Sequence, residues 1–138
     1  MKYIVLLLVF CFSLSVFAQA GVYIRESKNT DGTKMKWTLT LNDDGVFLYH
    51  FYRNIEGVGN PEENFYGKGT WKAENNVISL TTNKETDLDD MHTMNFSNSK
   101  ARYTTKSPRD TSDKVLKTSL RFYESDIFHI KGLELFKE

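Results

Sequence analysis

The chain has 138 residues, and its 18 basic and 18 acidic side chains give a formal net charge of zero at pH 7. This balance produces no overall positive field of the kind that draws a protein to nucleic acid, so we expect no nucleic-acid partner. Aromatic residues make up 14% of the chain, and this content favours strands.

An apolar segment with the pattern of a secretory signal peptide opens the sequence. Lys2 precedes an unbroken apolar run from Ile4 to Phe12, and the small residues Ala18 and Ala20 follow at the spacing of a cleavage site. Serines interrupt the apolar stretch before it reaches the roughly 20 residues that span a bilayer. We expect residues 1–20 to be a signal peptide, cleaved near Ala18 or Ala20, and the mature protein to be secreted or periplasmic without a transmembrane segment.

Residues 21–138 have the length of one domain, long enough to bury a core without covalent cross-links. The only cysteine, Cys11, lies in the predicted signal peptide, so the mature chain has no thiol for a disulfide or a metal. Phe10 precedes Cys11 at a position where lipoprotein processing requires a small residue. We therefore expect no lipid anchor.

The clearest structural pattern is a hairpin. Residues 34–41 alternate strictly between apolar and polar side chains, as a half-buried strand does. A turn with Gly45 follows, and residues 46–53 repeat the alternation. The side chains predicted to share the inward faces are Met35, Trp37, Leu39 and Leu41 on the first strand and Phe47, Tyr49 and Phe51 on the second.

A strand that contains two glycines follows an expected loop at residues 54–64. Residues 66–73 place Gly67, Gly69 and Trp71 on one face, and residues 77–82 are expected to pair back on them. Glycines within a strand indicate strong coiling or the close approach of a neighbouring side chain. They also leave room for an interior cavity.

The rest of the chain continues as short strands and loops, and no helical periodicity occurs after the signal peptide. The expected strands are 91–96, 100–105, 115–123, 127–130 and 133–137, and the expected loops are 82–90 and 106–114. Ala101 and Tyr103 are expected to point inward, and residues 115–123 place Leu116, Leu120 and Phe122 together with Thr118 on one face.

About eight to ten short strands at intervals of roughly 8 to 12 residues predict an all-β domain, either a barrel or a sandwich. Successive hairpins favour an antiparallel up-and-down β-barrel. Closure also removes the exposed strand edges that a secreted protein needs to avoid.

Short motifs recur along these elements. They are Gly21-x-Tyr23, Leu39-Thr-Leu-Asn-x-Asp-Gly45-x-Phe47-x-Tyr49, Gly67-x-Gly-Thr-Trp71-Lys, Val77-Ile-x-Leu80 and Leu133-x-Leu-Phe136. Together they resemble the small exported lipocalin-like domains of Bacteroidetes and related bacteria. The resemblance implies a meandering barrel whose interior holds a small apolar molecule. One departure is that Gly21-Val22-Tyr23 stands where a lipocalin opens with Gly-x-Trp.

A similar hairpin pattern occurs in the amino-terminal barrel of the envelope copper-stress lipoprotein. The Cys-x-x-Cys motif and the lipid anchor of that family are absent from this sequence. The second resemblance therefore transfers neither a metal site nor a stress-sensing role.

Inward aromatic side chains are the strongest candidates for a ligand site, because such sites are mostly apolar with a few placed polar groups. The candidates are Trp37, Tyr49, Phe51, Trp71 and Tyr103. The alternative is that these rings only fill the barrel, since an eight-stranded barrel is just wide enough to be filled by its own side chains.

Metal binding is not expected. His50, His92 and His129 have a spacing that matches no metal motif, and each lies in a different expected strand. An acidic run at residues 85–90 lacks the central glycine and the closing acid of a calcium loop, which favours a solvated loop. We expect no metal and no cofactor.

Basic residues gather between positions 100 and 121. They are Lys100, Arg102, Lys106, Arg109, Lys114, Lys117 and Arg121, against Asp110 and Asp113. This local excess of positive charge is suited to an anionic polysaccharide, a lipid headgroup or an acidic protein surface, and it is equally explained as a solvated strand face and loop.

The main functional expectation is a small-molecule binding protein. An alternative is a protein-interaction module that recognises an envelope partner through loops 54–64, 82–90 and 106–114. The sequence contains none of the common catalytic motifs, so we do not expect an enzyme.

Overall fold

In the computed structural model, the structure describes residues 18–138. Residues 1–17, which hold most of the predicted signal peptide, lie outside the described residues. Within residues 18–138 the chain forms strands, turns and loops without a helix. The strands are β1 (Gly21–Lys28), β2 (Lys34–Leu41), β3 (Val46–Asn54), β4 (Glu62–Glu74), β5 (Val77–Thr81), β6 (His92–Met94), β7 (Ser99–Thr104), β8 (Ser119–Glu124) and β9 (Glu134–Lys137). Within this described part, no helix of membrane-spanning length and hydropathy occurs.

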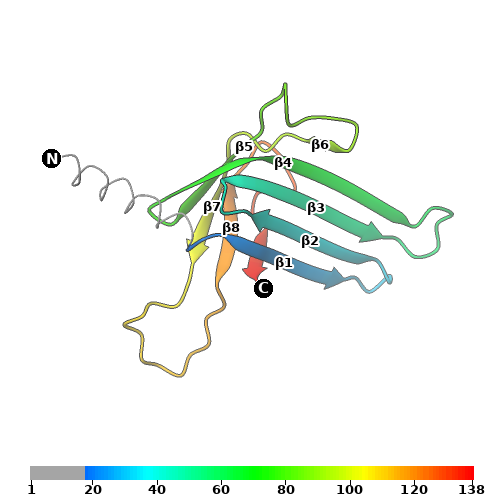
Figure 1. Cartoon of the computed structure of the whole chain (residues 1–138). Helices are drawn as coiled ribbons and strands as arrows, with labels where there is room; N and C mark the ends of the chain where they lie inside the picture. The colour runs from blue at the N-terminus through cyan, green and yellow to red at the C-terminus, as the bar shows by residue number, and fades with distance from the viewer. Residues whose placement is uncertain (1–17) are drawn as a thin grey trace.

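Eight of the strands close into an antiparallel barrel, as the sequence predicts (Figure 1). They follow one another around the barrel in chain order, and β9 returns to pair with β1 through Tyr23 and Ile24. β6 stays outside this order and pairs in parallel with β4. The meander is therefore of the up-and-down type, with one short strand added beside β4.

Large apolar side chains fill the closed part of the barrel. The fully buried ones are Tyr23, Leu39, Leu41, Phe47, Tyr49, Ile78, Leu80, Phe96, Leu120, Phe122, Ile130 and Leu135. The ring of Phe96 lies near the centre, 4.8 Å from the ring of Tyr49 and 5.4 Å from that of Phe47. The closed part of the barrel is therefore packed with its own side chains.

The two strand glycines of β4 make room for neighbours and not for a ligand. A Cβ at Gly67 would lie 2.5 Å from the Phe96 ring, and one at Gly69 would lie 2.0 Å from the carbonyl oxygen of Thr81. The close approach expected from the sequence is present, whereas the cavity considered at these glycines is occupied by Phe96 and Phe47.

Strand boundaries differ from the predictions in four places. β1 was not predicted as a strand, because Gly21–Lys28 lacks a clear apolar alternation. The loop expected at 54–64 is shorter, since β4 begins at Glu62. Residues 115–118 are not a strand, and Leu116 is exposed and not inward. Residues 127–130 form a turn and not a strand. Their apolar residue Ile130 packs in the core without pairing to a neighbouring strand.

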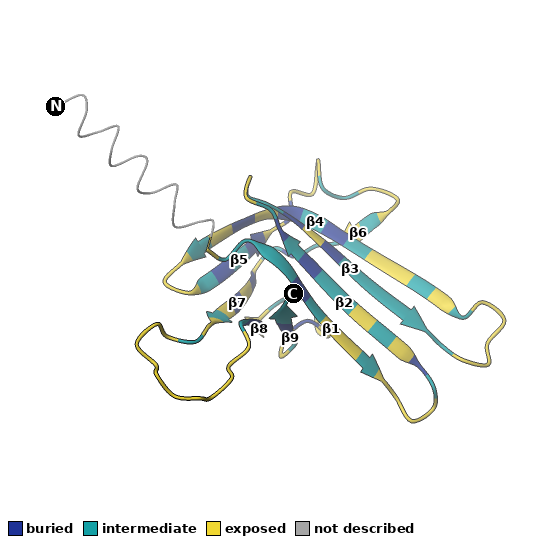
Figure 2. Cartoon of the chain, turned by 60° about the horizontal axis from the view of Figure 1, so that its bottom comes forward, coloured by how far each residue is buried: buried dark blue, intermediate teal, exposed yellow. Residues whose placement is uncertain are grey.

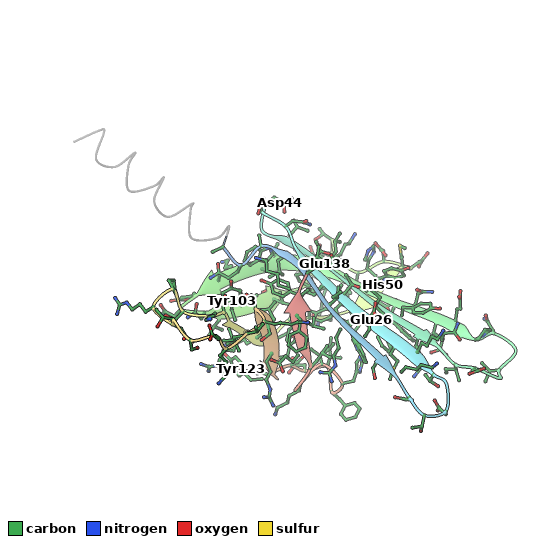
Figure 3. The ribbon with its side chains drawn as sticks, turned by 90° about the horizontal axis from the view of Figure 1, so that it is seen from below. Glu26, Asp44, His50, Tyr103, Tyr123 and Glu138 are labelled. Carbon is green, nitrogen blue, oxygen red and sulfur yellow. The ribbon has the colours of Figure 1, made fainter. Side chains whose placement is uncertain are left out.

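The barrel has one closed end and one open end. At the closed end the backbone N–H of Trp71 donates to Gly45, and that of Tyr103 donates to Asn76. At the other end β1 to β4 run on beyond the short strands β7 to β9 (Figure 1). Figure 2 shows buried residues where the strands close and mostly intermediate or exposed residues along the protruding parts. Figure 3 shows Glu26 on the protruding part and Tyr103 toward the closed end.

Candidate functional site

Strand register builds an aromatic row across the inner face of the protruding sheet. Trp37 on β2 pairs with Phe51 on β3, and Phe51 pairs with Phe65 on β4. The rings of Trp37 and Phe51 stack with centroids 5.2 Å apart, and those of Phe51 and Phe65 stack at 6.0 Å. Cross-strand aromatic pairs of this kind stabilise a sheet, and here they also form a continuous apolar floor.

The floor is part of a cavity of about 420 Å³ at the open end. Two methionines, Met35 from β2 and Met94 from β6, lie with the rings along the cavity, and Arg53 and His129 provide its polar groups. The cavity exists because β7 to β9 are too short to cover the inner face at this level. We call the set Met35, Trp37, Phe51, Arg53, Phe65, Met94 and His129 the apolar cup.

A charged pair lies at the rim of the apolar cup. Arg53 pairs with Glu63 across the β3–β4 register, and its Nε donates to Glu63 Oε2 at 2.9 Å. Both side chains are partly exposed. His129 is exposed and lines the cup from the turn before β9, whereas Arg53 lines it from β3. The cup thus combines an apolar floor with polar groups near its mouth.

The structure divides the five predicted ligand residues between two locations. Trp37 and Phe51 line the apolar cup. Tyr49 and Trp71 lie deeper, in the packed core, and Tyr103 packs against the core from β7. The indole Nε1 of Trp71 donates to the carbonyl of Asn42 at 2.9 Å, which fixes this ring at the closed end.

Tyr49 presents a buried hydroxyl among apolar neighbours. Its oxygen has no hydrogen-bond partner among the described residues of the protein. Burial raises the pKa of Tyr49 above its ordinary value of 10.0, because the phenolate would lose its hydration. The side chain is therefore an uncharged packing element beneath the cup.

Five of the cup residues are not among the predicted ligand residues: Met35, Arg53, Phe65, Met94 and His129. Phe65 falls between the expected loop 54–64 and the expected strand 66–73, yet its spacing of two from Gly67 continues the alternation of β4. A strand that begins a few residues earlier therefore includes Phe65 on the inner face. Met94 and His129 reach the cup through tertiary packing of β6 and of a turn, which no local pattern indicates.

The histidines do not come together as a metal site. His50 faces outward on β3, where its ring stacks on Tyr66 at 4.5 Å and Nε2 lies 2.8 Å from Asn64 Oδ1. His92 lies on the other side of Tyr66, and His129 is in the cup. In residues 18–138 no group of three or more histidine, cysteine or acidic side chains is arranged to hold a metal ion.

Asp89 organises the acidic loop before β6. Its carboxylate accepts the backbone N–H of His92 at 2.6 Å and of Met91 at 2.9 Å, and it pairs with Lys68 at 3.2 Å. These hydrogen bonds, led by those from His92, hold the pKa of Asp89 well below its usual range. The loop is therefore tied to β4 as a structural element.

Comparison with known protein families gives a match over most of the barrel. The family model of the NlpE N-terminal domain matches residues 29–112, more than half of the chain. The matched segment includes β2 to β7 and every cup residue except His129. No curated protein and no solved structure matches. The match supports a small β-barrel domain of a bacterial envelope lipoprotein type and is not specifically lipocalin-like.

Proposed function

Because the chain belongs to the NlpE N-terminal domain family, it is a bacterial envelope barrel protein, and we propose that it binds a small hydrophobic or amphipathic molecule in the apolar cup. This family is not a known enzyme family. The proposal keeps the lipocalin-like mode of binding, an apolar ligand held by a barrel, but moves the site from the barrel interior to its open end.

The stacked row of Trp37, Phe51 and Phe65 is the observation that carries the proposal. These rings lie on the inner face of the sheet, yet the short strands opposite leave them uncovered. Phe65 is 40% exposed, although Gly67, Gly69 and Trp71, which follow it on the same face of β4, are buried. Exposed apolar surface costs about 25 cal/mol for each Å², so a ligand that covered the row would recover that energy.

The size and lining of the cup favour a ligand with an apolar body and a polar end. Its volume of about 420 Å³ falls within the range of small-molecule sites, roughly 300–1,000 Å³. The apolar body would lie against the rings and against Met35 and Met94, whose flexible side chains adapt to different shapes. Arg53 and His129 at the mouth would face the polar end.

A fluorescent naphthalene sulfonate dye, displaced by dodecanoate, tests this function. The substitution Phe65→Ser removes one ring of the floor and is expected to weaken dye binding about tenfold, the loss typical of one aromatic contact with its area. The matched control is Tyr123→Ser, because Tyr123 on β8 has nearly the same exposure, 41%, but does not line the cup and has the guanidinium of Arg102 over its ring. Equal affinities of the two variants would contradict the proposal.

Tryptophan emission provides an independent readout. Trp71 is buried and Trp37 lines the cup, so a Trp71→Phe variant reports on Trp37 alone. Dodecanoate is expected to shift the emission of that variant to shorter wavelength. An unchanged spectrum at saturating dodecanoate would count against occupation of the cup.

We also propose that the protein reaches a secreted or periplasmic location through cleavage near Ala18 or Ala20. The family's place in the bacterial envelope and the leader pattern of residues 1–20 support this location. Mass spectrometry of the protein from its own host tests it, since an amino terminus at Gln19 or Gly21 is expected and retention of Met1 would contradict it.

A further inference from the structure

The charge of the chain is distributed very unevenly. Residues 100–121 hold seven basic and two acidic side chains, so the other residues hold eleven basic and sixteen acidic ones. The neutral total therefore conceals a positive segment and a negative remainder. Such a dipole orients a protein toward an anionic surface even when its net charge is zero.

This positive segment centres on a loop that projects from the closed end. Residues 105–118 join β7 to β8 and extend away from the barrel wall (Figure 1). At the base of the loop the hydroxyls of Thr105 and Thr118 lie 2.9 Å apart, and Thr118 accepts the backbone N–H of Lys137. The base is therefore fixed to the sheet while the loop stands free of it.

Two apolar side chains lie exposed among the charges of this loop. Val115 is 88% exposed and Leu116 is 45% exposed, and Lys114 and Lys117 flank them directly. Arg102 and Arg121 continue the positive charge along the wall, where they lie opposite each other across β7 and β8. Like charges in direct register destabilise a sheet, so folding alone does not favour this pair.

We propose that the loop 105–118 docks on the surface of a bilayer that contains anionic lipids. Lys114 and Lys117 contact the headgroups, and Val115 and Leu116 enter the boundary between headgroups and acyl chains. Basic residues beside exposed apolar ones are the combination that binds an anionic interface, because each part strengthens the other. An anionic polysaccharide would engage the charges but would give the two apolar side chains no apolar surface to enter.

Docking through this loop also sets the orientation of the barrel. The loop lies at the closed end, and the described chain begins at the same end, where Lys137 contacts the carbonyl of Ala18. The apolar cup lies at the other end of β2 and β3. A barrel docked in this way therefore turns its open end toward the aqueous space. This docking surface is independent of the proposed ligand site.

Sedimentation with phosphatidylcholine vesicles, with or without phosphatidylglycerol, tests the proposal. Wild-type protein is expected to bind only the anionic vesicles and to be released when salt is raised from about 0.1 M to about 1 M, which shortens the Debye length from about 10 Å to about 3 Å. Each basic side chain near such a surface strengthens binding roughly fivefold, so Lys114→Ser with Lys117→Ser is expected to weaken it about 25-fold.

Matched variants separate the possible outcomes. Lys34→Ser with Lys36→Ser removes the same charge from the open end and is expected to leave binding unchanged. Lys114→Arg with Lys117→Arg is expected to retain binding, and Val115→Ser with Leu116→Ser to lose most of it. Equal losses from the two lysine-to-serine pairs, or no binding of wild-type protein, would overturn the proposal.

Dextran sulfate distinguishes the other class of partner. The lipid proposal would be wrong if wild-type protein and the Val115→Ser, Leu116→Ser variant bound anionic vesicles with the same affinity. If the two proteins also bound dextran sulfate equally, the loop would be a polysaccharide site. The Phe65→Ser variant tests whether the cup and the loop act independently. It is expected to reduce dye binding while leaving vesicle binding unchanged. Thermal unfolding midpoints establish that each variant folds.

Discussion

Replacing Gly69 with alanine is expected to force β4 away from β5 and to destabilise the barrel strongly. The added Cβ would lie 2.0 Å from the carbonyl oxygen of Thr81 and 2.8 Å from the Phe47 ring. The closer of these atoms belongs to the backbone of the neighbouring strand and cannot rotate away. Overpacking of a core by a methyl group costs about 1–3 kcal/mol, and a backbone clash places this substitution at about 3 kcal/mol or more.

The measurement is thermal unfolding followed by circular dichroism. For a domain of this length, each kcal/mol lowers the midpoint by about 4 °C, so Gly69→Ala is expected to lower it by about 12 °C. Gly59→Ala is the matched control, since nothing lies within 4 Å of a Cβ there. Its midpoint should stay the same or rise slightly, because alanine restricts the unfolded chain. Similar midpoints for the two variants would refute the close approach of β4 and β5 on which barrel closure depends.

Two further substitutions test the core and the acidic loop. Tyr49→Phe is expected to raise the free energy of unfolding by about 1 kcal/mol, because it removes a buried hydroxyl without a hydrogen-bond partner in the protein. A urea midpoint below that of wild-type protein would show that the hydroxyl makes a hydrogen bond. Asp89→Asn is expected to destabilise the protein at neutral pH. Since the folded-state pKa of Asp89 is depressed, its stabilising effect is present above its unfolded value of about 4 and is lost as the pH falls toward the folded value. The difference between wild type and Asp89→Asn in urea unfolding should therefore narrow from about pH 7 to about pH 3, and a constant difference would contradict this explanation.

The sequence predicts the central hairpin well because one physical rule governs it. Trp37 and Phe51 alternate with polar residues that face water, so period two identifies both the strands and their inward faces. The same rule fails for β1, where Arg25 and Ser27 fall on positions that would be inward in a fully closed barrel. These positions belong to the protruding part, which nothing covers.

Much of the candidate site depends on strand length, and local patterns do not encode it. The apolar cup opens because β8 and β9 are short. At the closed end, Leu116 shows separately that an alternating segment of sequence can continue beyond the paired strand. His129 enters the cup from a turn that packing of Ile130 holds in place. Such contacts follow from the closed fold and could not be derived from spacing alone.

Methionine methyl resonances test the occupation of the apolar cup most directly. The chain after Met1 contains three methionines: Met35 and Met94 line the cup, whereas Met91 is exposed, lies next to His92 and does not line the cup. In a titration of methyl-labelled protein with dodecanoate, the resonances of Met35 and Met94 should shift together with one dissociation constant while that of Met91 stays in place. A shift of Met91 alone, or no shift at saturating dodecanoate, would contradict the central claim.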